Sequence, residues 1–154
     1  MRVLVQRIAR SAVYVAGEPI ASVGKGLLLL VGMAPRDGMG IFEWMARKIL
    51  RMRVFPHPGG QSLCLNVRES GGELLVVPQF TLYAEVHRGN RPSFTAAAPA
   101  QQASQQFAQW CDHLASQGVP TARGRFGANM HVELVNDGPM TFWIEKEAPD
   151  HSHT

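Results

Sequence analysis

The first 33 residues constrain the fold most, because their apolar residues alternate or run together in patterns typical of β-strands. Val3 and Val5 recur at a spacing of two between the polar residues Arg2 and Gln6, and turn-forming residues at positions 17–19 interrupt the pattern before it resumes. The run GLLLLVG from Gly26 is apolar throughout, as expected for a strand that is buried on both faces. This segment therefore predicts two or three antiparallel strands.

The hydrophobic period becomes helical after Gly40, and two amphipathic helices are predicted. The first covers residues 41–53 and is ended by Pro56 and Pro58. The second has Pro99 near its first turn and is ended by Gly118 and Pro120. The predicted buried residues are Phe42, Met45, Ile49 and Met52 in the first helix, and Phe107, Trp110, Cys111 and Leu114 in the second.

Strands at both ends of the chain, with the two helices between them, indicate one α/β domain with mixed sheets. A length of 154 residues, with 45% hydrophobic and 18% charged residues, fits a single folded domain. We expect this domain to span residues 1–147 and the tail 148–154 to be disordered. The further strands are predicted at residues 63–67, 73–77, 121–126, 131–136 and 140–145.

Net charge and cysteine content alone exclude few classes of protein. A net charge of +3 and a pI near 9.2 permit a polyanionic partner without requiring one. Cys64 and Cys111 form no CxxC pair and are expected to be reduced thiols. The longest apolar run is far shorter than the roughly 20 residues that span a bilayer, and the arginine-containing N-terminus does not resemble a signal peptide. We expect a cytoplasmic protein without a membrane helix.

The familiar constellations of catalytic side chains do not occur in the sequence. GQSLC at residues 60–64 falls one residue short of a nucleophile elbow, because Cys64 occupies the second glycine position. The six histidines have no zinc-binding spacing, and His151 and His153 fall in the expected tail. No GxGxxG or P-loop motif is present. We therefore expect neither a metal nor a cofactor.

Two prolines interrupt apolar segments near predicted strands. Pro78 follows Val77 and cannot donate a hydrogen bond to a β ladder. One interpretation is that Pro78 ends the ladder, so that the amides of residues 79–81 turn toward a ligand. The other is that it lies at an edge where no partner strand is available. For the Gly138-Pro139 pair, the local sequence alone favours a trans peptide bond in a turn.

Several separated segments carry a resemblance to one family. They are LLVVPQFTLYAE (74–85), GNRPSF (89–94), FGANMHVELVNDGPMTFWIE (126–145) and the opening MRVLVQRIARSAVYVAGE. Together they resemble the D-aminoacyl-tRNA deacylases, once called D-tyrosyl-tRNA deacylases, from Met1 to about Lys146. The resemblance implies an α/β fold of the D-aminoacyl-tRNA deacylase type. In this fold mixed, largely antiparallel β-sheets form a barrel-like domain, with two main helices on the outside.

The activity that the resemblance implies is hydrolysis of the ester between a D-amino acid and the 3′ end of tRNA, without a cofactor. Glycine mischarged on tRNA-Ala is an implied second substrate. The implied enzyme is a homodimer whose active site is completed across the subunit interface. Such an ester is already activated, and the neighbouring ribose hydroxyl can assist an attacking water, so the protein needs only to position the ester and stabilise the oxyanion.

Two family motifs, SQFTL and GPxT, indicate the site residues. Residues 78–82 read PQFTL, with Pro78 where the family usually has serine, and residues 138–141 read GPMT. The implied catalytic residues are Gln79, Phe80 and Thr81. The implied substrate-binding residues are Pro78, Gly138, Pro139, Met140 and Thr141.

Alternative roles stay open for the catalytic residues. Gln79 could bond the substrate or orient the loop, and Phe80 could stack on adenine or fill the core. For Thr81 we expect a supporting hydrogen bond, because the sequence places no histidine or lysine to activate it as a nucleophile. A threonine that is merely paired in a strand is the simpler alternative.

The resemblance also implies how L-amino acids are rejected. Family members hold the glycine–proline bond cis and insert it into the partner subunit's pocket, where the carbonyls of Gly138 and Pro139 form a rigid wall. That wall collides with an L side chain, whereas a D side chain points outward, so repulsion supplies the selectivity.

Two other functions remain open. A related animal family carries PQ in its first motif and accepts an L-amino acid, so Pro78 is compatible with shifted stereospecificity. A non-catalytic RNA-binding dimer is the second alternative. Three basic groups could contact RNA phosphates or simply form solvated faces. They are Arg47, Lys48 and Arg51; Arg88 and Arg91; and Arg123 and Arg125.

Overall fold

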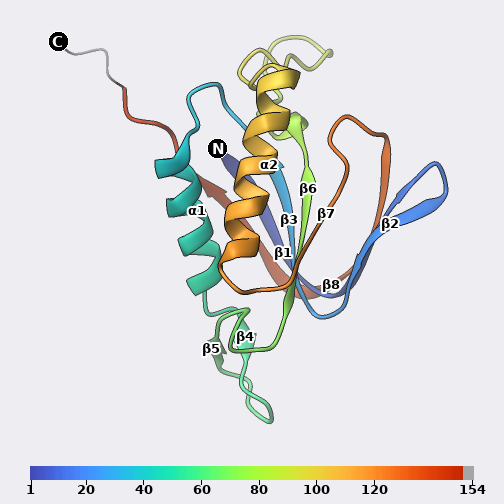
Figure 1. Ribbon diagram of the computed structural model, residues 1–154, viewed down its shortest axis with the longest axis vertical. Helices are drawn as coiled ribbons and strands as arrows, with labels where there is room; N and C mark the ends of the chain where they lie inside the picture. Colours follow the sequence, from blue (N-terminus) through green and yellow to red (C-terminus); the bar gives the residue numbers. More distant parts are fainter. Residues whose placement is uncertain (151–154) are drawn as a thin grey trace.

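The computed structural model describes residues 1–150, and their N-terminal segment forms three antiparallel strands, within the range that the sequence predicts (Figure 1). These strands are β1 (Arg2–Val15), β2 (Glu18–Val23) and β3 (Gly26–Gly32). Ala16 and Gly17 form the turn between β1 and β2, and their φ angles are 49° and 79°. A two-residue turn with both φ angles positive matches the right-handed twist of paired strands, so β1 and β2 form a hairpin.

The apolar sequence of β3 follows from its place inside the sheet. The strand order is β2-β1-β3-β6-β7, in which β3 pairs with β1 antiparallel and with β6 (Glu73–Pro78) parallel. On the other side of β6 lies β7 (Thr121–Arg123), which is also parallel to it. Leu27 packs in the larger core cluster with the helices, whereas Leu28 packs in a second cluster on the opposite face. Both faces of β3 are therefore covered, as predicted.

Two helices cover the outside of this curled, barrel-like sheet (Figure 1). They are α1 (Met39–Arg51) and α2 (Ala100–Ser116), and the predicted stripe of α2 is buried. The indole N–H of Trp110 on α2 donates to the carbonyl oxygen of Phe42 on α1 at 3.2 Å. The α1 helix ends before the predicted residue 53 because the backbone of Met52 is extended, with φ −59° and ψ 128°.

A small two-stranded sheet follows α1 and consists of β4 (Phe55–Pro56) and β5 (Leu63–Leu65). The sequence predicts a longer strand over residues 63–67. It stops at Leu65 because Asn66 and Glu69 close a turn. The N–H of each residue donates to the side chain of the other at 2.9 Å.

The last strand, β8 (Met130–Glu145), corrects the prediction of two separate strands at residues 131–136 and 140–145. It pairs antiparallel with β1 along almost its whole length. The register shifts where Asn136 pairs with Ile8 and Thr141 pairs with Gln6, so the residues between them bulge opposite one residue of β1. The Gly138-Pro139 pair interrupts the register of β8 without dividing the strand.

The two cysteines are reduced thiols over residues 1–150, as the sequence predicts. Neither Cys64 nor Cys111 forms a disulfide, and burial raises the pKa of the Cys111 thiol to about 12.

The first part of the expected tail, residues 148–150, contacts the body of the protein. The guanidinium of Arg36 donates to the carbonyl oxygen of Ala148 at 3.3 Å and pairs with the Asp150 carboxylate at 3.0 Å. The rest of the expected tail, with both of its histidines, lies outside the described residues. In the described range, no helix is both long and apolar enough to cross a membrane.

Candidate active site

The ladder between β3 and β6 continues one residue beyond Pro78. The N–H of Gln79 donates to the carbonyl oxygen of Val31 at 2.7 Å, so the prediction that this amide turns toward a ligand is wrong. Successive N–H groups of a strand point to opposite sides, and the donor that Pro78 lacks would point toward β7. The strand β7 has ended there, and the N–H of Gly124 makes the last bond on that side, to Val76 at 2.8 Å. On the side that faces β7, Pro78 therefore lies where no partner strand is available.

A single 3₁₀ turn, η1 (Phe80–Tyr83), follows and leaves two amides free. The N–H of Leu82 donates to the carbonyl oxygen of Gln79 at 3.2 Å, which closes the turn. Over residues 1–150, the N–H groups of Phe80 and Thr81 donate to no protein atom. The first amides of a helical turn have no partner within the turn, so they are available to a ligand.

The side chains of the first motif are open to solvent and are linked to one another. The side-chain amide of Gln79 donates to the hydroxyl oxygen of Thr81. Phe80 is 53% exposed, which excludes a role in filling the core. Its ring meets the ring of Phe94 edge to face, with 5.0 Å between the ring centroids.

Tyr83 anchors this turn to the sheet. A Cβ atom at Gly32 would lie 3.0 Å from the Tyr83 ring, so glycine is what permits the close packing. The guanidinium of Arg2 lies 4.3 Å from the centroid of the same ring and donates to the carbonyl oxygen of Leu82 at 2.9 Å. Burial raises the pKa of the Tyr83 phenol well above its ordinary value, and the negative charge of Asp37 adds to the rise. The phenol is therefore neutral at physiological pH and has a structural role.

A cavity of about 640 Å³ opens beside the first motif. Its walls come from the end of β6, from η1, from the segment that leads into α2, and from the segment that leads into β8. The lining residues are 77–80, 94, 95, 97–100, 103, 126–130 and 132.

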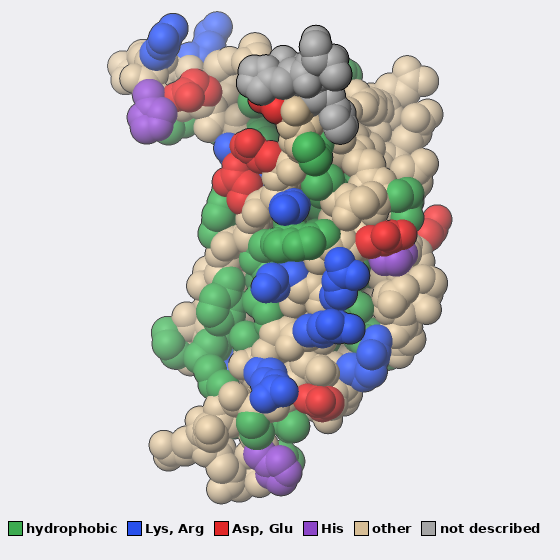
Figure 2. Space-filling model, turned by 90° about the vertical axis from the view of Figure 1, so that its left-hand side faces the viewer, with side chains coloured by type: hydrophobic (Ala, Val, Ile, Leu, Met, Phe, Trp, Pro, Cys, Tyr) green, Lys and Arg blue, Asp and Glu red, His purple; other side chains and the backbone are tan. Residues whose placement is uncertain are grey.

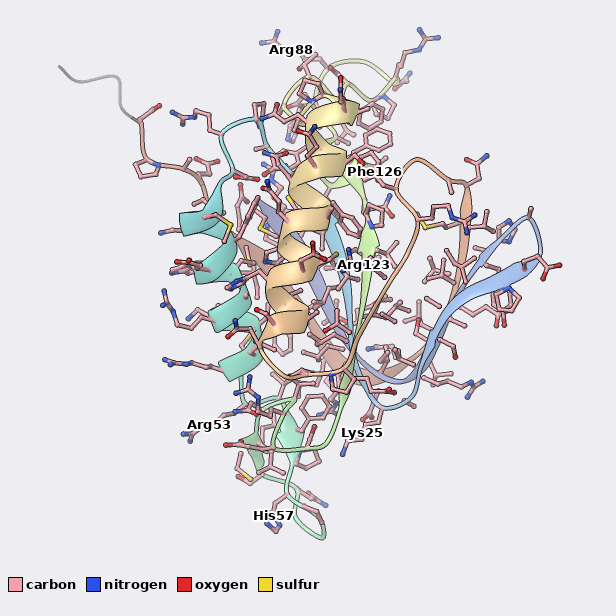
Figure 3. The ribbon with its side chains drawn as sticks, viewed as in Figure 1. Lys25, Arg53, His57, Arg88, Arg123 and Phe126 are labelled. Carbon is pink, nitrogen blue, oxygen red and sulfur yellow. The ribbon has the colours of Figure 1, made fainter. Side chains whose placement is uncertain are left out.

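Most of these lining residues have no predicted role. Phe94 and Thr95 come from one loop, and Phe126 and Asn129 come from another. Figure 3 labels Phe126 beside α2, where its ring centroid lies 6.2 Å from that of Phe107. Phe94, Phe126 and Asn129 fall within the segments GNRPSF and FGANM, so the resemblance contained the signal that could have identified them.

The second predicted motif lies elsewhere, in the bulge of β8 opposite Arg7. The peptide bond between Gly138 and Pro139 is cis, and both residues are exposed. Thr141 is also exposed, and its hydroxyl oxygen accepts a hydrogen bond from the side chain of Gln6 at 3.3 Å, whereas Met140 is half-buried. None of these four motif residues lines the cavity of their own chain.

A buried arginine supports this bulge from inside the molecule. Arg7 is 7% exposed, and its Nε atom donates to the carbonyl oxygen of Asp137 at 3.1 Å. Its Nη1 atom donates to the carbonyl oxygen of Val54 at 2.6 Å. The side chain of Asn136 donates to the backbone carbonyls of Arg7 at 2.9 Å and of Met140 at 3.4 Å. Sequence reasoning missed Arg7, although an arginine inside a half-buried strand was the available signal.

The chemistry available at the cavity is that of backbone groups and neutral side chains. Its lining contains no histidine, lysine, arginine, aspartate or glutamate. Within residues 1–150, no group of three or more histidine, cysteine or acidic residues has a metal-binding arrangement. Phe80 lines the cavity, whereas Thr81 lies next to it in the chain and is outside the lining. The free amides of both residues are available to stabilise an oxyanion, and the Thr81 hydroxyl is available to orient a polar group.

Comparisons with known proteins identify the family of this chain. A family model described as D-Tyr-tRNA(Tyr) deacylase matches residues 4–145. A D-aminoacyl-tRNA deacylase of Cyanothece sp. is 48% identical over 149 residues, covering 97% of this chain and 94% of its own length. One from Cereibacter sphaeroides is 45% identical over 145 residues, with coverage of 94% and 99%.

Two solved structures share the fold of this chain. The structure titled c-Myc DNA Unwinding Element Binding Protein has a TM-score of 0.90 and 38% identity, and the match covers 96% of this chain and all of that one. The structure of a probable eukaryotic D-amino acid tRNA deacylase has a TM-score of 0.76 at 16% identity, with coverage of 93% and 98%, and shows the fold alone. These matches place the chain in a class of enzymes, the hydrolases that act on a tRNA ester bond. Within that class, it belongs to the D-aminoacyl-tRNA deacylase family.

Proposed function

We propose that the protein hydrolyses the ester bond of D-aminoacyl-tRNA in the cytoplasm and releases the free D-amino acid and tRNA. Glycyl-tRNA formed on tRNA-Ala is the proposed second substrate, because glycine has no side chain to reject. The observation that carries this proposal is a cavity of about 640 Å³ beside two free backbone amides, with no titratable side chain in its lining.

The proposed reaction relies on the substrate and the backbone. The terminal ribose hydroxyl assists a water molecule in attacking the ester carbonyl, and the amides of Phe80 and Thr81 stabilise the developing oxyanion. One such donor in a partly dried site contributes about 3 to 4 kcal/mol. Gln79 holds the Thr81 hydroxyl in place, and the exposed Phe80 ring offers a stacking surface for the terminal adenine.

Selection against L-amino acids is the proposed role of the bulge on β8. The carbonyls of Gly138 and Pro139 from one subunit enter the cavity of the other and form a wall on the L side. A soft apolar pocket discriminates one methylene by only about 1 to 3 kcal/mol, so collision with a rigid wall is the more effective device. The hydrogen bonds of Arg7 and Asn136 support this role, because they restrict the bulge on both sides.

A homodimer is part of this proposal, and the exposed residues of β8 support it. Leu134, Val135 and Trp143 are 37%, 38% and 49% exposed. Within residues 1–150, β8 pairs only with β1, so its other edge is free. A long edge strand with exposed apolar side chains is a surface that a second molecule normally covers.

Pro78 favours a second candidate function, a deacylase that acts on an L-aminoacyl-tRNA. Proline replaces the usual serine of the family motif, and it lines the cavity next to Gln79. A change at this position alters the wall that the substrate contacts. The family membership and the intact GPMT motif favour the D-specific reaction over this one.

A stereochemical assay tests the proposal. Purified protein is incubated with D-Tyr-tRNA, L-Tyr-tRNA and glycyl-tRNA-Ala, and the remaining ester is measured over time. Loss of the D ester and the glycyl ester alone is the expected result. Loss of the L-tyrosyl ester would support the second candidate, and survival of all three would indicate a non-catalytic RNA-binding module.

A further inference from the structure

An exposed loop of residues 85–93 stands at the end of the molecule above α2 (Figures 1 and 3). Two backbone hydrogen bonds close its base, from the Glu85 N–H to the Ser93 oxygen at 2.7 Å and from the Ser93 N–H to the Glu85 oxygen at 3.0 Å. Gly89 at its tip has a φ angle of +69°, which allows the sharp turn. We call this segment the arginine loop, because Arg88 and Arg91 flank the turn.

The arginine loop rises from the rim of the candidate active site. The chain leaves the closed base at Ser93 and continues directly into Phe94 and Thr95, which line the cavity. Phe94 also contacts Phe80 of the first motif. A polymer whose last unit occupies the cavity would therefore pass close to this loop as it leaves.

The charge of the arginine loop is uncompensated at its tip. Over residues 1–150, neither Arg88 nor Arg91 belongs to an ion pair, and both side chains are exposed. The only acidic residue of the loop, Glu85, lies at the base and accepts a hydrogen bond from the His87 N–H at 2.7 Å. In Figure 3 the Arg88 side chain points away from the body of the protein.

The other basic groups are less suited to a strand that leaves the cavity. Arg123 is engaged by Asp112 at 2.8 Å. The basic residues of α1 form a larger patch (Figure 2). In Figure 1, however, α1 lies on the opposite side of α2 from the segment that leads into β8, and this segment lines the cavity. The basic residues of α1 also stand near the C-terminus of the helix, where positive charge stabilises the helix itself.

We propose that the arginine loop binds the backbone phosphates of the single-stranded 3′ end of tRNA while the terminal aminoacyl-adenosine occupies the cavity. This inference rests on the proposed function and adds the surface that holds the polynucleotide. Guanidinium groups suit this task because they bind phosphate oxygens in a bidentate manner. The contacts carry no base information and serve to position the substrate.

The test compares two double variants and two substrates. The variant Arg88→Gln/Arg91→Gln removes the charge of the loop, and Arg47→Gln/Arg51→Gln removes equal charge from α1 as a control. The substrates are D-Tyr-tRNA and the D-tyrosyl ester of adenosine, which has no phosphate. The loop variant is expected to raise KM for D-Tyr-tRNA at least tenfold, with kcat within twofold of the parent. Hydrolysis of the adenosine ester should change less than threefold, and the α1 variant should behave as the parent does on both substrates.

Binding of uncharged tRNA provides a readout that is independent of activity. Single-stranded contacts contribute a slope of about 0.7 per phosphate to the salt dependence of binding, so loss of two contacts should lower the slope by about 1.4. The variant Arg88→Lys/Arg91→Lys should restore most of that slope.

Three results would overturn the role of the arginine loop: an unchanged KM for D-Tyr-tRNA, an equal loss with the adenosine ester, or an equal effect of the α1 variant. If the parent hydrolyses neither substrate, the proposed function fails instead. In that case the binding of uncharged tRNA tests the arginine loop independently of activity. An unchanged salt dependence in the loop variant would show that the loop does not bind phosphates.

Discussion

The two proline-containing segments of the molecule differ in what surrounds them. Around Pro78 the chain is held by the ladder to β3, by the buried Tyr83 ring and by Arg2, and it forms the wall of a cavity. Around Pro139 the chain is held from behind by Arg7 and Asn136, and its front is exposed. One segment is concave and the other projects outward, and in the proposed mechanism a second copy of the chain brings them together.

This difference separates binding from selection in the proposed mechanism. The first segment supplies free amides and a hydroxyl, which act on any ester that enters the cavity. The second supplies carbonyl oxygens on a supported projection, which act only by excluding one configuration. Variants of the two segments should therefore change different measured quantities.

The largest effect is expected for Arg7→Met, which removes the support of the projecting segment but keeps a similar volume. The carbonyls of Val54 and Asp137 would lose their donor. The Val54 carbonyl is buried and the Asp137 carbonyl is partly exposed. Because a buried unsatisfied group costs about 1 to 3 kcal/mol, the free energy of unfolding should fall by about 1 to 3 kcal/mol in urea denaturation. The ratio of D-Tyr-tRNA to L-Tyr-tRNA hydrolysis should fall at least tenfold. An unchanged ratio in a folded variant would show that Arg7 does not contribute to the selection against L-amino acids.

Gly32→Ala tests the concave segment. The added Cβ would lie 3.0 Å from the Tyr83 ring and 3.2 Å from the Gln79 carbonyl oxygen, so η1 must shift. We expect a loss of about 1 to 2 kcal/mol in unfolding free energy and a lower kcat, with the D-to-L ratio unchanged.

Gly138→Ala is the matched control for that variant. The nearest atom to its Cβ would be the side-chain oxygen of Asn136, at 3.0 Å. The hydrogen bonds that support the bulge come from the side-chain nitrogen instead, so a small shift of the side chain can relieve this contact. Stability should therefore stay within about 0.5 kcal/mol of the parent, as for other exposed substitutions, while the D-to-L ratio falls. A lower kcat with an unchanged ratio would contradict the division of roles.

Thr81→Ala should have a moderate effect on activity. Its hydroxyl accepts a hydrogen bond from Gln79, and a net contribution of about 0.5 to 1.5 kcal/mol corresponds to at most about a tenfold loss in kcat. Thr81→Ser keeps the hydroxyl and should match the parent in single-turnover assays. Complete loss in the alanine variant, with full activity in the serine variant, would instead identify a threonine nucleophile.

The smallest effect is expected for Glu145→Gln, at the end of β8. Burial favours a higher pKa for Glu145, but hydrogen bonds from Trp143 and Arg2 outweigh it and hold the pKa below its ordinary value. A carboxylate with a lowered pKa stabilises the fold above its unfolded pKa, and this contribution is lost as the pH falls through the folded pKa. Because the Arg2–Glu145 pair is partly exposed, the parent should be more stable than the variant by less than about 1 kcal/mol at pH 7. The difference should shrink as the pH falls through the lowered pKa of Glu145, and a constant difference across pH would exclude the charge as its cause.

The sequence was sufficient for elements whose burial follows a regular period. The α2 stripe and the doubly buried β3 could be predicted because their apolar residues recur at one spacing or fill the whole strand. The continuity of β8 could not, because Gly138-Pro139 gives a local turn signal and the pairing with β1 on both sides of the bulge overrides it.

The candidate site was predictable to a smaller extent. Pro78 indicated a missing donor, but a single residue does not reveal toward which neighbouring strand that donor would point. The ladder bond of Gln79 therefore came as a correction. The contacts of Phe94 with Phe80 and of Arg7 with Val54 join segments far apart in the chain, and no local pattern encodes them.

The bulge on β8 also affects how the family can evolve. Its extra residues stand opposite a single residue of β1, and the pairing with β1 continues on both sides of the bulge with a shifted register. Insertions, deletions or substitutions within the bulge would leave the framework of the barrel in place. Under the proposed mechanism, stereochemical preference can therefore change while the architecture of the domain is inherited unchanged.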